Sequence, residues 1–259
     1  MASASASLAP ELAQVEIRDR SDTNCVQEDG TFCFDWAIDN LDRYVTPTLE
    51  HLLLVGVSVI AGFVLAFALA LLSHRQRWLI PPFTGATGIL YTIPSLAFFF
   101  LLLPVTGRGR DTAIIALTAY TLQIIYRNVV AGLNNVPGEA KDAGRGMGMT
   151  ERQLLWRVEL PLSVPEIVAG LRIATVSTVA IATLAVFAGG GGLGVEIYNS
   201  IDFKTGLLIA SFLAVGMAVL FDLLLVLMQR LLTPWTAAPA GERTERGSRF
   251  IDLFRRTAT

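Results

Sequence analysis

Charged residues are scarce in this sequence of 259 residues: Asp, Glu, Lys and Arg together make up 16% of it, against roughly 25% in soluble domains. Hydrophobic residues account for 53%. The 20 Lys and Arg residues nearly balance the 22 Asp and Glu residues, so no overall basic field attracts nucleic acid. The composition excludes a single soluble domain and a nucleic-acid partner, and it favours a polytopic protein surrounded by a lipid bilayer.

Histidine and cysteine are nearly absent, with two residues of each. His51 and His74 would lie on the order of 34 Å apart along one helix, which is too far to share a metal ion or a catalytic site. The nucleotide-binding pattern Gly-x-x-x-x-Gly-Lys-Ser/Thr is absent as well. We therefore expect no catalytic residue, no cofactor and no metal site in this chain, and any energy for its work must come from a partner.

Long uncharged segments predict five membrane-spanning helices, because about 20 apolar residues are needed to cross the hydrocarbon core. The predicted spans cover residues 52–72, 79–105, 112–133, 167–188 and 205–229. Pro94 predicts a kink within the second span. The glycine-rich run that starts at Gly189 predicts that the fourth helix ends near Ala188. We expect an all-α, polytopic membrane helix bundle over residues 34–232, flanked by a flexible tail at 1–33 and a basic tail at 233–259.

Lys and Arg are unevenly distributed between the predicted loops, and this asymmetry predicts the orientation. With the N-terminus outside, the cytoplasmic set has thirteen members: Arg75, Arg77, Arg127, Lys141, Arg145, Arg152, Arg157, Arg230, Arg243, Arg246, Arg249, Arg255 and Arg256. The outside set then has six: Arg18, Arg20, Arg43, Arg108, Arg110 and Lys204. We expect a plasma (inner) membrane protein with an extracytoplasmic N-terminal tail and a cytoplasmic C-terminal tail.

The predicted outer tail contains both cysteines of the chain. Cys25 and Cys33 would lie in an oxidising compartment, and their separation of eight residues permits a disulfide. The stretch from Phe34 to Tyr44 mixes aromatic and aliphatic residues with aspartates. It predicts an amphipathic helix at the outer membrane interface.

The segment 134–165, between the third and fourth predicted spans, is too long for a simple reversal of the chain. Residues 138–145 predict a short helix, and glycines then predict a turn. Thr150 and Gln153 have the spacing of a capping box, which predicts a second short helix that ends at Pro161. Ser163 and Glu166 repeat this spacing and predict the start of the helix that becomes the fourth span. We expect two short helices that lie across the cytoplasmic end of the bundle.

This segment resembles the EAA motif of the permease subunits of binding-protein-dependent ABC importers. The motif positions occur here in the family's order and with its spacing, and they are occupied by Asp142, Ala143, Gly144, Gly148, Val158, Leu160 and Pro161. The sequence departs from the family pattern at Asp142, Gly144 and Val158, where Glu, Ala and usually Ile are found. In that family the loop forms coupling helices that dock into a groove on the ATPase subunit, so the resemblance implies that these residues couple the chain to an ATPase.

Further segments resemble the osmoprotectant importers for glycine betaine, carnitine and choline. They lie at residues 143–150, 156–161, 170–175 and 191–194, and the resemblance covers about 34–232. It implies a MetI-like ABC importer permease fold that pairs with a second permease subunit, identical or sister. Two ATP-binding subunits and an extracytoplasmic substrate-binding protein would complete the transporter.

Asp222 is the acid within the predicted spans, and two interpretations of it stay open. In an ATP-driven importer it needs no proton-coupling role, which favours a packing hydrogen bond. In an ion- or proton-coupled secondary transporter it would be the coupling site, although five spans without a detectable internal repeat argue against that class. The spans show no convergent polar pocket, so the sequence does not assign the substrate path.

Overall fold

A computed structural model describes residues 32–234, and every regular element within this range is helical. The first half contains α1 (Phe34–Asp39), η3 (Leu41–Tyr44), α2 (Val45–Arg75), η4 (Arg77–Leu79), α3 (Ile80–Thr92), α4 (Ser95–Thr106) and α5 (Arg110–Asn135). The second half contains α6 (Gly138–Gly146), α7 (Glu151–Leu154), η5 (Leu155–Glu159), α8 (Leu160–Ala182), η6 (Thr183–Ala188), α9 (Leu193–Asn199) and α10 (Lys204–Leu232).

Four helical stretches are long and apolar enough to cross a membrane: 41–75, 110–135, 151–188 and 204–232. A fifth candidate is the pair α3 and α4, whose axes are bent by 98°. Ile93, between the two helices, adopts extended backbone angles, because a proline disfavours the helical conformation of the residue before it. The kink predicted at Pro94 is therefore a complete break of the helix.

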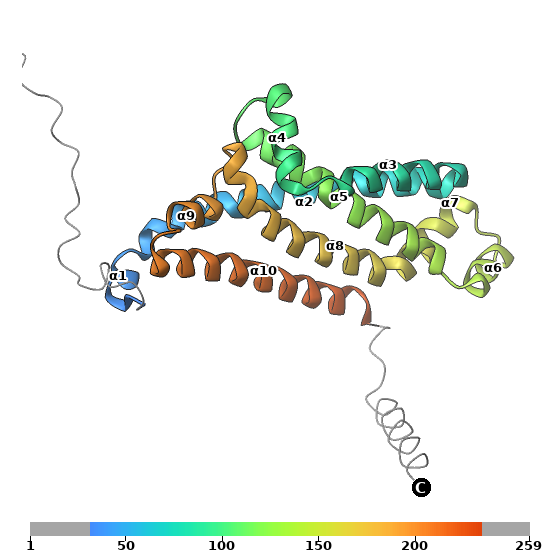
Figure 1. The fold of residues 1–259 in the computed structure, drawn as a ribbon. Helices are drawn as coiled ribbons and strands as arrows, with labels where there is room; N and C mark the ends of the chain where they lie inside the picture. The colour runs from blue at the N-terminus through green and yellow to red at the C-terminus, as the bar shows by residue number, and fades with distance from the viewer. Residues whose placement is uncertain (1–31, 235–259) are drawn as a thin grey trace, which may run out of the picture.

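The long helices run side by side, with α5 at the centre (Figure 1). Helix α5 packs against α2 and α8 as well as α3 and α4, whereas α10 packs mainly on α8 and α9. Small residues allow α5 and α8 to approach closely: a Cβ added at Gly132 would lie 3.1 Å from the Cβ atoms of Ser163 and Glu166. Figure 1 also shows α6 and α7 at one end of the bundle, the loop end, and α1 and α9 at the opposite end, the far end.

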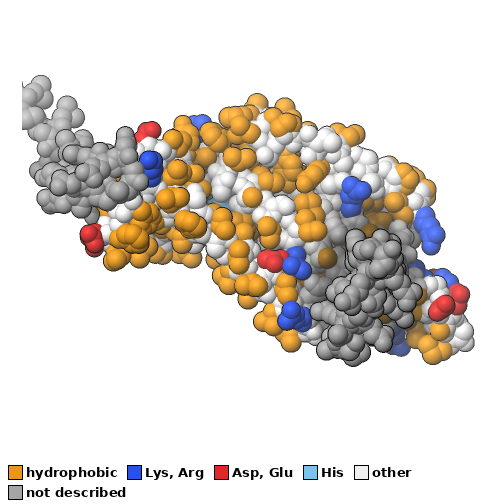
Figure 2. All heavy atoms as spheres, turned by 60° about the horizontal axis from the view of Figure 1, so that its bottom comes forward, with side chains coloured by type: hydrophobic (Ala, Val, Ile, Leu, Met, Phe, Trp, Pro, Cys, Tyr) orange, Lys and Arg blue, Asp and Glu red, His pale blue; other side chains and the backbone are white. Residues whose placement is uncertain are grey.

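The surface of the long helices is apolar, as contact with lipid requires. On α10 the side chains of Phe212, Val215 and Leu223 are each at least 60% exposed. Figure 2 shows hydrophobic side chains over much of one face, with most of the Lys and Arg side chains of that face on the half toward the loop end. This distribution suits a bundle embedded in a bilayer.

Two expectations about the loop between α5 and α8 are wrong. Pro161 does not end a separate helix, because α7, the π-helical η5 and α8 follow one another without interruption from Glu151 to Ala182. Pro161 lies in the first turn of α8, directly after the π-helical η5. Ser163 does not cap a helix either: it lies inside α8, and its hydroxyl donates to the Leu160 carbonyl at 2.9 Å.

The predicted tails fall largely outside the described residues. Cys25 lies there, so its disulfide with Cys33 stays a prediction. Cys33 itself is buried, and its backbone N–H donates to Thr205 Oγ1 of α10 at 3.0 Å.

The predicted amphipathic helix is shorter than expected, since α1 ends at Asp39 and a 3-10 turn follows. Phe34 and Ile38 of this segment are exposed.

Candidate functional site

The seven motif residues lie at the loop end. Asp142, Ala143 and Gly144 belong to α6, Gly148 follows α6, and the remaining three lie in η5 and the first turn of α8. The two parts of the motif meet at Gly144, where an added Cβ would lie 2.6 Å from Leu154 Cδ1 and 3.7 Å from Val158 Cγ2. Glycine at this position therefore lets α6 pack directly on α7 and η5.

Gly148 closes α6 in a Schellman motif. Its backbone φ is +78°, a left-handed conformation that glycine adopts without a steric penalty. The Gly148 N–H donates to the Arg145 carbonyl at 2.9 Å, and the Met149 N–H donates to the Gly144 carbonyl at 3.2 Å. These two bonds satisfy carbonyls that a helix end otherwise leaves free. The geometry of the turn therefore explains why glycine occupies this motif position.

Thr150 starts the helix that follows, as its spacing predicts. The Gln153 N–H donates to Thr150 Oγ1 at 3.3 Å, and the Thr150 N–H donates to Gln153 Oε1 at 2.9 Å. This reciprocal pair is a complete capping box. The turn between α6 and α7 is thus fixed on both sides, by the Schellman motif and by the capping box.

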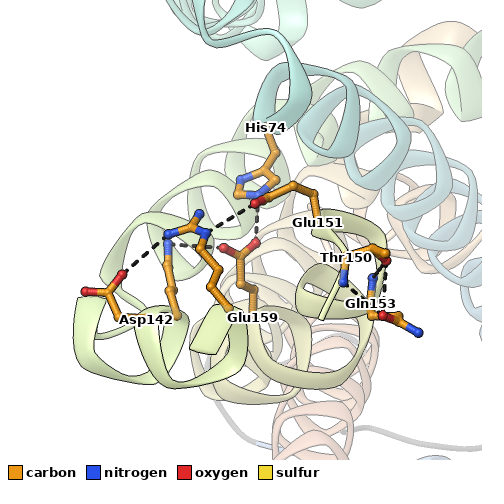
Figure 3. A network of polar contacts seen from close by, with 8 residues as sticks. His74, Asp142, Thr150, Glu151, Gln153 and Glu159 are labelled. Carbon is orange, nitrogen blue, oxygen red and sulfur yellow. Dashed lines mark hydrogen bonds and ion pairs between the residues drawn. The ribbon is translucent and has the colours of Figure 1, made fainter. Parts of the chain in front are cut away.

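The buried Glu159 forms a polar cluster with His74 and Lys141, and Figure 3 shows its contact with His74. Its Oε2 lies 2.7 Å from His74 Nε2, and its Oε1 lies 3.4 Å from Lys141 Nζ. Lys141 also donates to the Leu133 carbonyl at the end of α5, at 3.3 Å. Reasoning from the sequence missed this cluster, because His74 is 85 residues from Glu159 in the chain and no local pattern links them.

The outer surface of α6 carries a second, exposed set of charges. Arg145 Nε donates to Glu151 Oε1 at 3.2 Å, and Arg145 Nη1 lies 3.5 Å from Asp142 Oδ1. The hydrogen bond with Glu151 raises the pKa of the Arg145 guanidinium. Such exposed pairs contribute little to stability. Met147 and Trp156 are also exposed, so the loop end presents charged and apolar side chains together, as surfaces that bind other proteins do.

Asp222 of α10 forms a two-pronged ion pair with Arg172 of α8. Arg172 Nε donates to Asp222 Oδ1 at 2.8 Å, and Nη2 donates to Oδ2 at 3.0 Å. The side chains are 32% and 34% exposed. The expectation that Asp222 makes a packing contact rather than facing lipid alone fits this geometry, and its partner Arg172 was not identified from the sequence.

At the far end, Glu50 of α2 holds the glycine-rich run. The Gly192 N–H donates to Glu50 Oε2 at 3.0 Å, and Gly191 and Gly192 both have positive φ. The run begins where η6 ends at Ala188. Among residues 32–234, no group of three or more His, Cys, Asp or Glu side chains is arranged to hold a metal ion.

These features define an all-α membrane protein with a helical loop that projects from one end of the bundle. The comparison with known families agrees: residues 58–238 match the model of the binding-protein-dependent transport system inner membrane component. The chain belongs to this family of transporter permease subunits.

Curated relatives align over most of the chain. The osmoprotectant import permease protein OsmW of Salmonella typhimurium is 36% identical over 77% of this chain and 96% of its own length. The choline transport system permease protein OpuBB of Bacillus subtilis is 35% identical over 72% of this chain and 87% of its own length. The carnitine transport permease protein OpuCB of Listeria monocytogenes is 34% identical over 80% and 96%.

Solved structures share the fold. A chain of the MetNI methionine ABC transporter, in an inward-facing crystal form, superposes with a TM-score of 0.68 at 24% identity and covers 73% of this chain and 96% of its own. An amino acid ABC transporter crystallised with histidines gives a TM-score of 0.61 at 18% identity, over 78% of this chain and 99% of its own. The expected MetI-like permease fold is confirmed.

Proposed function

We propose that this chain is the membrane-spanning subunit of an ATP-driven importer for a small osmoprotectant of the glycine betaine, choline and carnitine class. The observation that carries the proposal is the similarity to osmoprotectant, choline and carnitine permeases over more than 70% of the chain. A second permease subunit, two ATP-binding subunits and an extracytoplasmic binding protein would complete the transporter.

The loop end supplies the proposed contact with the ATPase. The residues assigned to coupling are Asp142, Ala143, Gly144, Gly148, Val158, Leu160 and Pro161. The turn between α6 and α7 is fixed on both sides, by the Schellman motif and by the capping box, and α7 continues through η5 into α8. A push on α7 is therefore delivered along a continuous helix into the membrane. Closure of the ATPases on ATP would draw two such loops together and turn the bundles outward.

The alternative, a secondary transporter with Asp222 as the coupling site, is less well supported. A proton- or ion-coupling carboxylate must be free to bind its ion, whereas both Asp222 oxygens accept hydrogen bonds from Arg172. This arrangement suits a contact that joins α8 and α10.

The test is uptake by the assembled transporter in sealed vesicles. The chain is reconstituted with its ATPase and binding protein, and uptake of labelled glycine betaine and of labelled choline is measured with ATP, without ATP, and with a proton gradient alone. We expect uptake only with ATP. Uptake that follows the proton gradient and ignores ATP would refute the proposal and restore the secondary transporter.

We also propose the orientation with the N-terminus outside, supported by the uneven distribution of Lys and Arg. It predicts that a membrane-impermeant maleimide added to intact cells labels Cys25 only after reduction, because Cys25 forms a disulfide outside the cytoplasm with Cys33, which is itself buried. Cys25→Ser is the control, since it should leave a thiol on Cys33 that reacts in denaturant without reduction. Labelling that requires permeabilised cells would contradict the orientation.

A further inference from the structure

One buried carboxylate joins three separate parts of the chain at the loop end. Glu159 is 4% exposed and lies in η5, beside the last turn of α2 and beside α6 (Figure 3). Its two oxygens face different partners, His74 of α2 at 2.7 Å and Lys141 of α6 at 3.4 Å. The position of α6 relative to α2 is therefore set through Glu159.

The contact of Glu159 with α2 and α6 depends on the charge of its carboxylate as well as on its size. A buried carboxylate is costly unless each oxygen has a partner, and here the available partners come from two elements that are far apart in sequence. The side chains of Lys141 and His74 are also largely shielded, at 16% and 20% exposure. Displacing α6 from α2 would break at least one of the two contacts of the buried Glu159 carboxylate, which favours movement of the two elements together.

Helix α2 extends this junction to the far end of the bundle. It runs for 31 residues from Val45 to Arg75 without a break. Near its start, Glu50 accepts the Gly192 N–H at 3.0 Å, and His51 Nε2 lies 3.1 Å from the Val179 carbonyl of α8. A displacement of α2 at the loop end is thus transmitted to the segment that connects α8 to α9.

We propose that Glu159 is the positioning residue that transmits movement of α6 to α2 during transport. The α7–η5–α8 helix carries one part of the ATPase-driven movement, and the Glu159 junction carries another part to α2. The segment around Gly192 then moves with α2 at the face where substrate would enter. This inference rests on the proposed function and adds a second route of coupling to it.

The test is the number of osmolyte molecules imported per ATP hydrolysed, measured on the complete transporter in vesicles with glycine betaine or choline, whichever the unmodified transporter imports. In Glu159→Gln, which keeps the size and removes the charge, we expect this ratio to fall at least tenfold while ATP hydrolysis falls less than twofold. A merely structural role would reduce both rates together, because fewer complexes would be intact, and the ratio would stay unchanged. An unchanged ratio overturns the proposal.

Two further variants keep the test decisive. His74→Ala removes only the contact with α2 and leaves Glu159 paired with Lys141. It therefore tests the proposal even if the transporter with Glu159→Gln does not assemble. We expect the same fall in the number of osmolyte molecules imported per ATP hydrolysed. Glu139→Gln removes an exposed carboxylate from the first turn of α6 and should leave the ratio unchanged. An equal fall in Glu139→Gln would overturn the assignment to Glu159. If the unmodified transporter ignored ATP, the proposed function itself would fail, which is a different result.

Discussion

Replacing Gly148 with alanine is the sharpest perturbation of the loop end. No atom lies within 4 Å of a Cβ added at this position, so the substitution causes no clash and acts only through the backbone. At a φ of +78°, an L-residue other than glycine pays roughly 1–2 kcal/mol. The closed form of the turn should therefore become about 5- to 30-fold less populated relative to its open form.

Two matched variants separate this conformational effect from other causes. Gly146→Ala makes the same chemical change two residues earlier, inside α6 and also with nothing within 4 Å. It should stabilise the helix by up to about 1 kcal/mol, because alanine favours the helical conformation. Gly148→Asn should lie between the unmodified chain and Gly148→Ala, since asparagine tolerates the left-handed region.

The assay is hydrogen exchange of the peptide that covers residues 140–150, followed by ATP-driven uptake. In Gly148→Ala we expect the amides at positions 148 and 149 to exchange about 5- to 30-fold faster, because their bonds to the Arg145 and Gly144 carbonyls close the helix end. Uptake should fall in the same order among the variants. Unchanged exchange in Gly148→Ala, or equal acceleration in Gly146→Ala, would refute the role of the left-handed glycine.

Two predictions concern the membrane helices. Gly62→Ala should destabilise the purified protein by about 1–3 kcal/mol through overpacking against Thr121 of α5, whereas Gly56→Ala in the same helix has free space and should be neutral or stabilising; thermal unfolding in detergent compares them. Asp222→Asn should lower the unfolding midpoint and leave ATP-driven uptake per folded molecule unchanged, and adding Arg172→Gln should restore part of the midpoint. Loss of uptake at a normal level of folded protein would instead favour ion coupling.

The long helices of the structure do not begin and end where the apolar runs of the sequence do. Helix α2 begins at Val45, seven residues before the predicted start, and its first turns include Glu50 and His51. These polar residues interrupt the apolar run in the sequence, yet their partners are the Gly192 N–H and the Val179 carbonyl. Those partners lie more than 120 residues away in the chain, so a local window could not find them.

The candidate site divides in the same way into local and distant features. The capping box at Thr150 and the turn at Gly148 depend on residues within about six positions of each other, and the sequence predicted both. The continuous passage from α7 into α8 was missed, because the π-helical turn at Leu155–Glu159 has no recognisable sequence pattern. The contact between Glu159 and His74 depends on how α2 packs beside the loop, which only the tertiary structure shows.

The departures from the EAA pattern have physical explanations that leave the coupling assignment intact. At Gly144 an added Cβ would lie 2.6 Å from Leu154 Cδ1, so alanine would require the fully buried Leu154 to move or α6 to shift outward. Val158 also contacts this position, with its Cγ2 3.7 Å from the added Cβ, so the identities of Gly144, Leu154 and Val158 depend on one another. Asp142 keeps the acidic charge of the pattern on an exposed side chain, where a shorter carboxylate disturbs no packing. The departures at Gly144 and Val158 therefore concern packing within the loop, and the one at Asp142 concerns an exposed side chain. The turn at Gly148 and the entry into α8 at Pro161 keep their geometry, and these are the features on which the proposed contact with an ATPase depends.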